Sequence, residues 1–429
     1  MDDESNDNMN ALNHQDKKQP FLTGAACFWL ALFPLLHLGS YSQLTRDKWM
    51  LMLIGCGLTL ACFLAECFRG EVSPRLRLPQ VLGLSLMGWM LLCCLLSPFR
   101  ASVWWIGASA RREGLATQLC YLSLFLIFSC SRVQLRPLLW ACGASVVICG
   151  AIVLLQRAGA NPFGLYPAGR SYATNPEFQG PSGNIDIGTG TLCLLAGLFL
   201  AGVFRERGVQ RWACVGGLGI CVFLIVTMEV QFGLLALGAL ALWALWQLLP
   251  RKWRLPVLLC LIALAVLLVW YWPGGSDGMW EMHEVLHGRP QLSFGSNRLA
   301  VWVYSLRLAG TQLLSGSGSD TFEPRFNTFL QEEGLTIPTE QDGIPLPDYF
   351  DNPHNEYIAQ LIHHGLPGLL LFLALLLCSP VCSRRVCPAL LAWAVQAFFS
   401  FSVCILAPLF WVTLGMAVSG ETECAPPGS

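Results

Sequence analysis

The chain has 429 residues, of which 54% are hydrophobic and only 12% are charged, and its formal net charge at pH 7 is −1. Because soluble domains carry about 25% charged residues, this composition excludes an ordinary soluble globular protein and indicates that lipid surrounds most of the chain. The balanced charge also gives no electrostatic reason to expect a nucleic-acid partner.

Long apolar segments follow one another along the chain and predict an all-α integral membrane protein. A bilayer core requires about 20 apolar residues per helix. The segments that meet this length lie near residues 21–39, 49–67, 79–97, 115–131, 137–156, 187–204, 212–229, 232–249, 256–273 and 356–378. The last apolar stretch, 388–418, is too long for one helix, and Pro408 divides it into two. We therefore predict about twelve transmembrane helices, with a long outer-face loop before the tenth.

The connections between these segments predict the orientation of the chain. Residues 1–20 are polar and predict a disordered cytoplasmic tail. More than half of the 26 Lys and Arg residues lie on the same side as this tail, which predicts that both termini are cytoplasmic. The parts that follow are helices one to nine over 21–273, the long loop with short helices over 274–353, helices ten to twelve over 354–418, and a second cytoplasmic tail over 419–429.

Polar residues that are unusual in a membrane protein gather on the predicted outer face. They include Arg111, Arg112, Glu113, Arg170, Asp186, Glu229, Arg298, Arg325, His354 and Asn355. Outer connections are normally poor in arginine, so each of these arginines either binds a ligand or anchors the chain among lipid headgroups. His363 and His364 lie further along the tenth span, where we expect one of them to face lipid headgroups. The acidic, proline-containing stretch 315–353 predicts a mobile lid over an outer cavity.

Residues 283–287 read His-Glu-Val-Leu-His, the H-E-x-x-H pattern in which two histidines one helical turn apart bind zinc. Gly278 precedes the pattern and Gly288 and Pro290 follow it, so only a short helix fits and the second histidine lies at its end. The usual downstream zinc ligands are absent from the sequence. We interpret the segment as a short amphipathic helix on the outer face of the membrane and predict no metal site.

Three stretches in the second half of the chain are informative through their order and spacing. Arg298-x-x-x-Trp302 opens a helix, GSGSDTF (316–322) ends it in a glycine-rich turn, and HNEY (354–357), with GLPGLLLF (365–372) after it, opens the next span. In this order and at these spacings they resemble the core of the O-antigen ligase-like family. That family includes lipopolysaccharide O-antigen ligases, O-antigen polymerases and pilin O-oligosaccharyltransferases.

Two earlier stretches, ARREGLATQLCY (110–121) and GPSGNIDIGTGTL (180–192), are also similar to the family. One stretch departs from it. Where the family often has a Ser-Arg pair at the start of the eighth helix, this chain reads TMEVQFGLLAL (227–237), with Gln231 near the position of that arginine. A different acceptor, or a different distribution of charge around the donor, would follow from this change.

The resemblance implies a GT-C-like, inverting glycosyltransferase of the bacterial inner membrane that needs no metal or cofactor. It would move a glycan from an undecaprenyl-diphosphate carrier to a hydroxyl of a glycan, of lipid A-core or of a protein. Arginine suits such a donor, because it stays charged and binds phosphate oxygens in pairs. Arg298 is the first choice for diphosphate contact, and His354 would act either as the base for the acceptor hydroxyl or as a diphosphate ligand. The further substrate-binding candidates are Arg111, Arg112, Arg170, Asn355, Trp302, Glu229 and Asp186.

Several alternatives stay open at this point. Asn355 could orient His354 or simply cap its helix, and Glu229 and Asp186 could pair with arginines without chemical roles. A polytopic transporter or a flippase of lipid-linked sugars would also bind diphosphate. It would be expected to show internal repeats and paired broken helices, and we find no convincing repeat in the sequence.

Overall fold

The computed structural model describes residues 19–74, 76–108, 110–275, 278–337, 340–341, 344–345, 350–382, 386–401 and 403–419. Most of both predicted cytoplasmic tails lies outside these residues, and so does most of the stretch 338–349 in the acidic loop.

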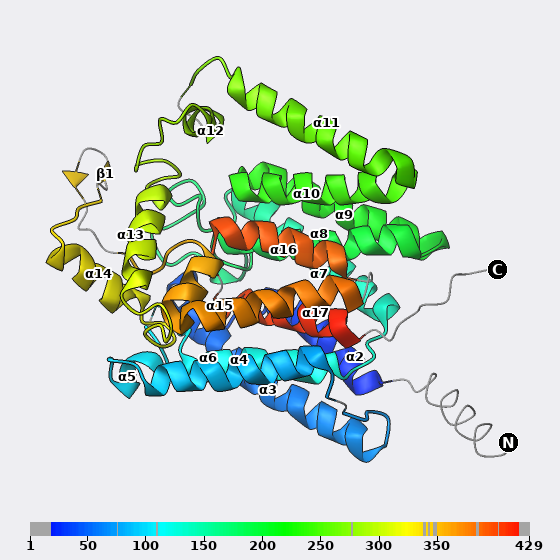
Figure 1. Ribbon diagram of the computed structural model, residues 1–429. Coiled ribbons are helices and arrows are strands. Elements are labelled where there is room, and N and C mark those ends of the chain that lie inside the picture. Colours follow the sequence, from blue (N-terminus) through cyan, green and yellow to red (C-terminus); the bar gives the residue numbers. More distant parts are fainter. Residues whose placement is uncertain are drawn as a thin grey trace.

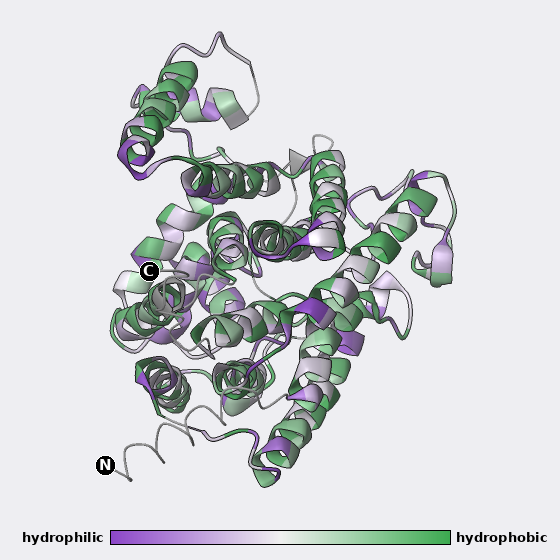
Figure 2. Ribbon diagram, turned by 90° about the vertical axis from the view of Figure 1, so that its right-hand side faces the viewer, coloured by the Kyte–Doolittle hydropathy of each residue, from purple (hydrophilic) through white to green (hydrophobic). Residues whose placement is uncertain are grey.

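Apart from two short strands, the regular elements of the described chain are helices, and several are long and apolar enough to span a membrane, which confirms an all-α membrane protein. The helices that are long and apolar enough to cross a membrane are α3 (Leu44–Phe68), α4 (Leu78–Leu95), α7 (Leu135–Arg157), α8 (Ile185–Arg205), α9 (Gly208–Met228), α10 (Gln231–Leu248), α11 (Arg251–Trp270) and α15 (Glu356–Cys382). The shorter apolar helices are α6 (Leu115–Ser129), α16 (Cys387–Phe399), α17 (Ala407–Ser419), and a first helix composed of α2 (Pro20–Cys27), the π-helix η1 (Phe28–Leu32) and the 3-10 turn η2 (Phe33–Leu35). They form a bundle (Figure 1), in which apolar residues cover the helices and polar residues collect mainly at their ends and in the connections (Figure 2).

The polar connections contain short elements that gather at one end of the bundle (Figure 1). These are α5 (Ala101–Trp104), α12 (Gly278–Leu286), α13 (Arg298–Gly310), α14 (Phe322–Glu332), the 3-10 turns η3 (Tyr41–Gln43) and η4 (Pro162–Gly164), and the strands β1 (Glu340–Gln341) and β2 (Ile344–Pro345). The two strands pair antiparallel, with Glu340 opposite Pro345. α14 buries Phe322, Phe326 and Leu330, so this described part of the predicted lid packs against the protein.

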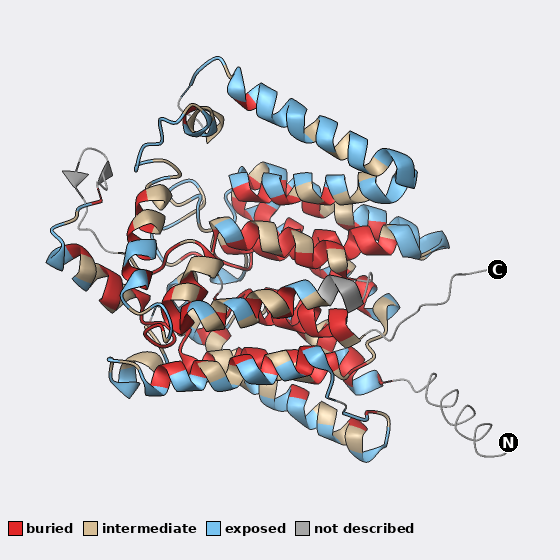
Figure 3. Cartoon of the chain, viewed as in Figure 1, coloured by how far each residue is buried: buried red, intermediate tan, exposed pale blue. Residues whose placement is uncertain are grey.

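Among the long helices α8 is the most enclosed: 83% of the residues in its most apolar stretch are buried, whereas only 6% are buried in the corresponding stretch of α11 (Figure 3). Glycine allows helices to approach α8 closely. A Cβ atom at Gly197 would lie 2.3 Å from the Cα atom of Ala389 in α16. α11 has almost no protein neighbours along its length, so lipid must solvate it.

α15 is broken inside the membrane-spanning segment, which the apolar sequence did not indicate. Gly365 has φ 66° and ψ −175°, values outside the helical region, so two helices meet there at a kink. The turn that follows α13 fills the break: the Ser317 N–H donates to the Ile362 carbonyl at 3.1 Å, and the Gly318 N–H donates to the His363 carbonyl at 2.9 Å. Two sequence motifs, 316–322 and 365–372, therefore form one packed unit.

A buried arginine from α14 completes this unit. The Nη1 of Arg325 donates to the carbonyl of Ile362 at 3.2 Å and to the Ser317 hydroxyl at 3.1 Å, and its Nη2 donates to the Leu308 carbonyl at 3.0 Å. Main-chain groups inside a membrane protein must find partners within the protein. Arg325 and the glycine-rich turn supply them where α15 cannot, so this arginine has a structural role.

Replacing Gly365 by alanine should destabilise the protein by more than about 2 kcal/mol. The added Cβ would lie 2.1 Å from the Leu314 carbonyl oxygen, and the residue would be forced into positive φ. The midpoint of thermal unfolding in detergent measures the effect. Gly143→Ala is the matched control, because Gly143 lies in α7 and no atom lies within 4 Å of the place that its Cβ would occupy. Equal midpoints for the two variants would contradict this account of the break.

Candidate functional site

The candidate site lies at the N-terminal end of α15, among the polar connections. His354 adopts a left-handed backbone conformation with φ 49°, and its N–H donates to the Asn352 side chain at 2.8 Å. Asn355 caps the helix, because its Oδ1 accepts the N–H groups of Tyr357 and Ile358 at 3.0 Å each. Of the two possible roles of Asn355, the structure therefore shows helix capping.

The His354 side chain is half-buried and stands edge-on to the ring of Phe401, with ring centroids 5.2 Å apart. Its Nδ1 has no hydrogen-bond partner among the described residues. Burial lowers the pKa of His354 to about 4; the positive charge of Arg298 and, more weakly, that of Arg111 act in the same direction, and Asp351 opposes them. The imidazole is therefore neutral near pH 7 and able to accept a proton.

Arg111 lies on the same aromatic ring as His354. Its guanidinium is 4.9 Å from the centroid of Phe401, and its Nε is 3.6 Å from Oδ1 of Asp320. The side chain is only 7% exposed, yet its Nη1 has no hydrogen-bond partner among the described residues. A buried guanidinium with unused N–H groups is suited to an anionic ligand.

Arg298 begins α13 directly after two residues with positive φ, Ser296 and Asn297. Its Nη1 donates to the Gly295 carbonyl at 3.2 Å, and its Nε has no partner among the described residues. Its charge acts on both His354 and Asp186, so the structure brings these three predicted residues into one electrostatic neighbourhood.

Trp302 lies one helical turn after Arg298 and holds the segment that leads to His354. Its indole N–H donates to the Pro353 carbonyl at 2.9 Å, and its ring packs edge-on against Phe398 at 5.4 Å. The spacing Arg298-x-x-x-Trp302 thus places a positive charge near His354 and, one helical turn later, a tryptophan that fixes the preceding backbone by a hydrogen bond.

Other predicted residues lie in different surroundings. Arg112 packs its guanidinium over the ring of Trp49 at 5.1 Å. Arg170 is exposed, in a turn where its N–H donates to the Pro167 carbonyl. Glu229 is exposed and has φ 58°, at the end of α9.

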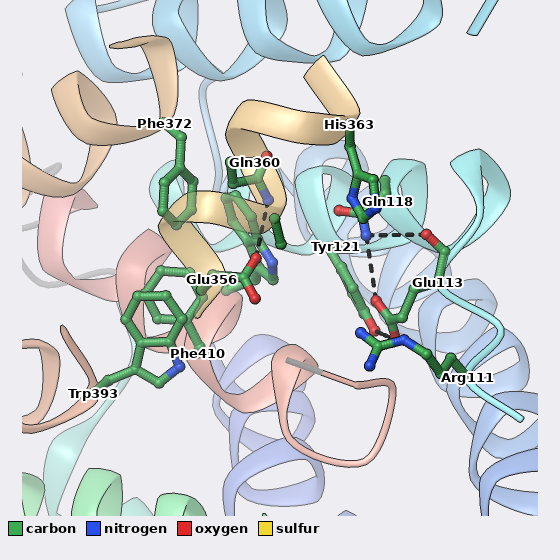
Figure 4. A pocket seen from close by; sticks show the side chains of 12 residues that line it. Arg111, Glu113, Gln118, Tyr121, Glu356, Gln360, His363, Phe372, Trp393 and Phe410 are labelled. Carbon is green, nitrogen blue, oxygen red and sulfur yellow. Dashed lines mark hydrogen bonds between the residues drawn. The ribbon is translucent and has the colours of Figure 1, made fainter. Parts of the chain in front are cut away.

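A pocket between α6, α15, α16 and α17 adjoins Arg111 and contains groups that the sequence did not single out (Figure 4). Its polar lining is Arg111, Glu113, Gln118, Tyr121, Glu356, Gln360 and His363, and its apolar wall includes Trp393 and Phe410. The Glu113 carboxylate accepts hydrogen bonds from the Tyr121 hydroxyl at 2.8 Å and from the Gln118 side-chain amide at 3.3 Å. Burial raises the pKa of Glu113 well above its usual range, although Tyr121 and Arg111 oppose the shift.

Both histidines of α15 face the protein, so the expectation that one would face lipid headgroups is wrong. His363 is 9% exposed and lines the pocket, and its Nε2 has no partner among the described residues. His364 is 1% exposed and hydrogen bonds to the Gln360 side chain at 2.9 Å and to the Ser319 hydroxyl at 3.1 Å. The break at Gly365 accounts for this burial, because the glycine-rich turn covers both residues.

The H-E-x-x-H segment forms α12 (Gly278–Leu286), with the second histidine just beyond its end. The rings of His283 and His287 stack 4.1 Å apart between Trp280 and Trp270, whose rings lie 5.0 and 4.2 Å from their respective histidines. Across the described ranges, no three His, Cys, Asp or Glu side chains are grouped closely enough to hold a metal ion. The stack instead attaches α12 to α11.

A known protein family matches a large part of this region. Residues 216–373 match the family model described as O-antigen ligase. The matched range contains α13, the glycine-rich turn, His354 and the broken part of α15. No curated protein matches the chain. The resemblance inferred from the sequence motifs is therefore confirmed, because residues 216–373 carry the domain of the O-antigen ligase-like family.

Proposed function

We propose that this protein moves a glycan from an undecaprenyl-diphosphate carrier to an acceptor hydroxyl at the outer face of the bacterial inner membrane. Family membership indicates a membrane glycosyltransferase of the O-antigen ligase or polymerase type. The observation that carries the finer proposal is the neutral imidazole of His354, whose buried Nδ1 has no partner among the described residues and which lies under the influence of Arg111 and Arg298.

The two arginines would bind the diphosphate. Each has a guanidinium nitrogen without a partner among the described residues, and guanidinium groups bind phosphate oxygens strongly. Positive charge placed where the leaving group becomes more anionic lowers the barrier. Trp302 would position the backbone before His354 through its bond to Pro353.

The reaction would be a single displacement at the anomeric carbon of the donor sugar. The acceptor oxygen forms a bond to this carbon, the bond to the diphosphate oxygen breaks with its electron pair, and the configuration inverts. His354 would take the proton of the acceptor hydroxyl at Nδ1, since a neutral imidazole can accept a proton and an imidazolium cannot. The lipid diphosphate leaves as an anion beside Arg298 and Arg111.

The same proposal includes a topology with both termini in the cytoplasm and the long loop, 274–353, in the periplasm. The gathering of the short polar elements at one end of the bundle supports it (Figure 1). The acceptor would be a growing glycan, lipid A-core or a protein. A flippase of lipid-linked sugars is the other class of protein that would bind this donor. The break in α15 does not favour it, because protein groups fill the break.

Alanine at Arg298 or at His354 should lower kcat/KM for glycan transfer by about 100-fold or more, the usual cost of losing one group that stabilises the transition state. The measurement uses purified enzyme in detergent with EDTA present and a lipid-linked glycan as donor. His283→Ala is the control and should match the wild type.

Full activity of both site variants would contradict the proposed site. Loss of activity with EDTA and with His283→Ala would place the chemistry at α12 instead. Donor binding through Arg298 without transfer to any offered acceptor would favour the flippase.

The pH dependence should distinguish the two possible roles of His354. As a base it works while neutral, so kcat/KM should fall as the pH is lowered through its pKa of about 4. As a cationic diphosphate ligand it would work only when protonated, and kcat/KM would rise over the same range. Asp351→Asn tests the assignment, because Asp351 raises the pKa of His354 and its removal should move the acidic limb to lower pH. An unmoved limb would assign it to another group.

A further inference from the structure

The carboxylate of Asp320 lies at the centre of the turn that carries Arg111. Asp320 is 3% exposed and belongs to the glycine-rich turn after α13, far away in sequence. Its Oδ2 accepts the N–H of Ala108 at 2.8 Å and the N–H of Glu113 at 3.1 Å. Its Oδ1 lies 3.6 Å from Nε of Arg111. One buried carboxylate therefore holds both ends of the turn and the side chain between them.

The backbone of this turn is shaped around the carboxylate. Gly107 has φ 89°, and a Cβ atom there would lie 2.1 Å from Oδ2 of Asp320. Arg112 also has a positive φ, 57°. A turn with such backbone angles persists only when surrounding contacts fix it, and the two N–H groups bound to Asp320 are contacts of this kind.

Asp320 meets Arg111 through an ion pair and leaves hydrogen-bond donors of the guanidinium unused. The carboxylate oxygen lies 3.6 Å from Nε, and both Nε and Nη1 are without a hydrogen-bond partner among the described residues. Arg325 shows the opposite case, since both of its Nη atoms donate to carbonyl and hydroxyl oxygens of the protein. Arg325 is thus committed to structure, whereas Arg111 is oriented and still has donors to offer.

We infer that Asp320 is a positioning residue that fixes the described residues 107–108 and 110–114 of the turn before α6 and holds Arg111 on Phe401 beside His354, with its unpaired donors turned to the donor diphosphate. The inference rests on the proposed function. Asp320 acts through Arg111 and touches no substrate. Its effect should therefore disappear when Arg111 is absent, which a general role in stability would not produce.

The test is a double-mutant cycle on purified full-length protein with a lipid-linked diphosphate glycan. Asp320→Asn keeps the size of the side chain but removes its charge, and we expect a rise of roughly tenfold in the donor KM. Arg111→Ala should have a comparable effect, and the double variant should be no worse than Arg111→Ala alone. Asp47→Asn is the matched control, because Asp47 is 4% exposed and its Oδ1 also lies 3.6 Å from an arginine Nε, that of Arg46.

Gly107→Ala provides a second route to the same result, since its Cβ would displace the carboxylate without changing any charge. Gly274→Ala controls for the backbone, because Gly274 also has positive φ (110°) and has no atom within 4 Å of the position of its Cβ. Gly107→Ala should raise the donor KM, whereas Gly274→Ala should not. Hydrogen–deuterium exchange of the 107–114 segment gives a readout that does not depend on catalysis, and it should quicken in Asp320→Asn and Gly107→Ala.

The outcomes separate the inference from the proposed function. If the wild type transfers glycan, then additive losses in the double variant, or an unchanged donor KM in Asp320→Asn, would overturn the inference. The proposed function would still stand in that case. An absence of transfer by the wild type would overturn the function. In that case unchanged exchange of the 107–114 segment in Asp320→Asn would overturn the positioning role as well, and faster exchange would support it.

Discussion

The kink at Gly365, where main-chain groups bond to other parts of the protein, determines how the end of the bundle that carries the short polar elements is packed. A membrane-spanning helix normally satisfies its own backbone, and any interruption must be satisfied by other parts of the protein. Here the turn at 316–318 and the side chain of Arg325 provide the partners. This requirement brings the loop after α13 down onto α15, buries His363 and His364, and places Asp320 where it can reach the turn before α6.

In that arrangement the candidate site contains buried groups of opposite charge. Charged groups removed from water are stable only when paired, and Asp320 provides an opposite charge for Arg111 while leaving its Nη1 unpaired. Phe401 receives both Arg111 and His354, so the cation and the neutral imidazole share one aromatic surface. Burial and the two arginines together keep His354 without a proton near neutral pH.

Much of the fold was predictable from the sequence, because apolar length alone locates membrane helices. The division of the last apolar stretch at Pro408 agrees with a helix that begins at Ala407. The motifs around His354 predicted the family resemblance, which the match over residues 216–373 confirms. The break in α15 could not be predicted in this way, since Gly365 and its neighbours read as one apolar run. The irregular first helix was equally hidden: Lys48, from α3, donates to the carbonyls of Phe33 and Pro34.

The arginines show most clearly what the sequence could not reveal. Arg111, Arg112, Arg298 and Arg325 all lie on the predicted outer face, and their surroundings in the sequence do not distinguish them. Only the tertiary contacts show that carbonyl and hydroxyl oxygens use both Nη atoms of Arg325, whereas Arg111, Arg112 and Arg298 each keep a nitrogen without a hydrogen-bond partner among the described residues. In the sequence Asp320 is likewise one of many acidic residues in the loop, and only its contact with Arg111 in the structure distinguishes it.

The exposure of α11 has a consequence for the environment in which the protein works. This helix is fastened near one end, where Trp270 stacks on His287 of the α12 region, and along the rest of its length it meets almost no protein. A helix held in this way adjusts its tilt to the thickness of the surrounding bilayer. Lipid chain length therefore helps to set the position of α11, and reconstitution in thin or thick membranes gives this part of the molecule different geometries.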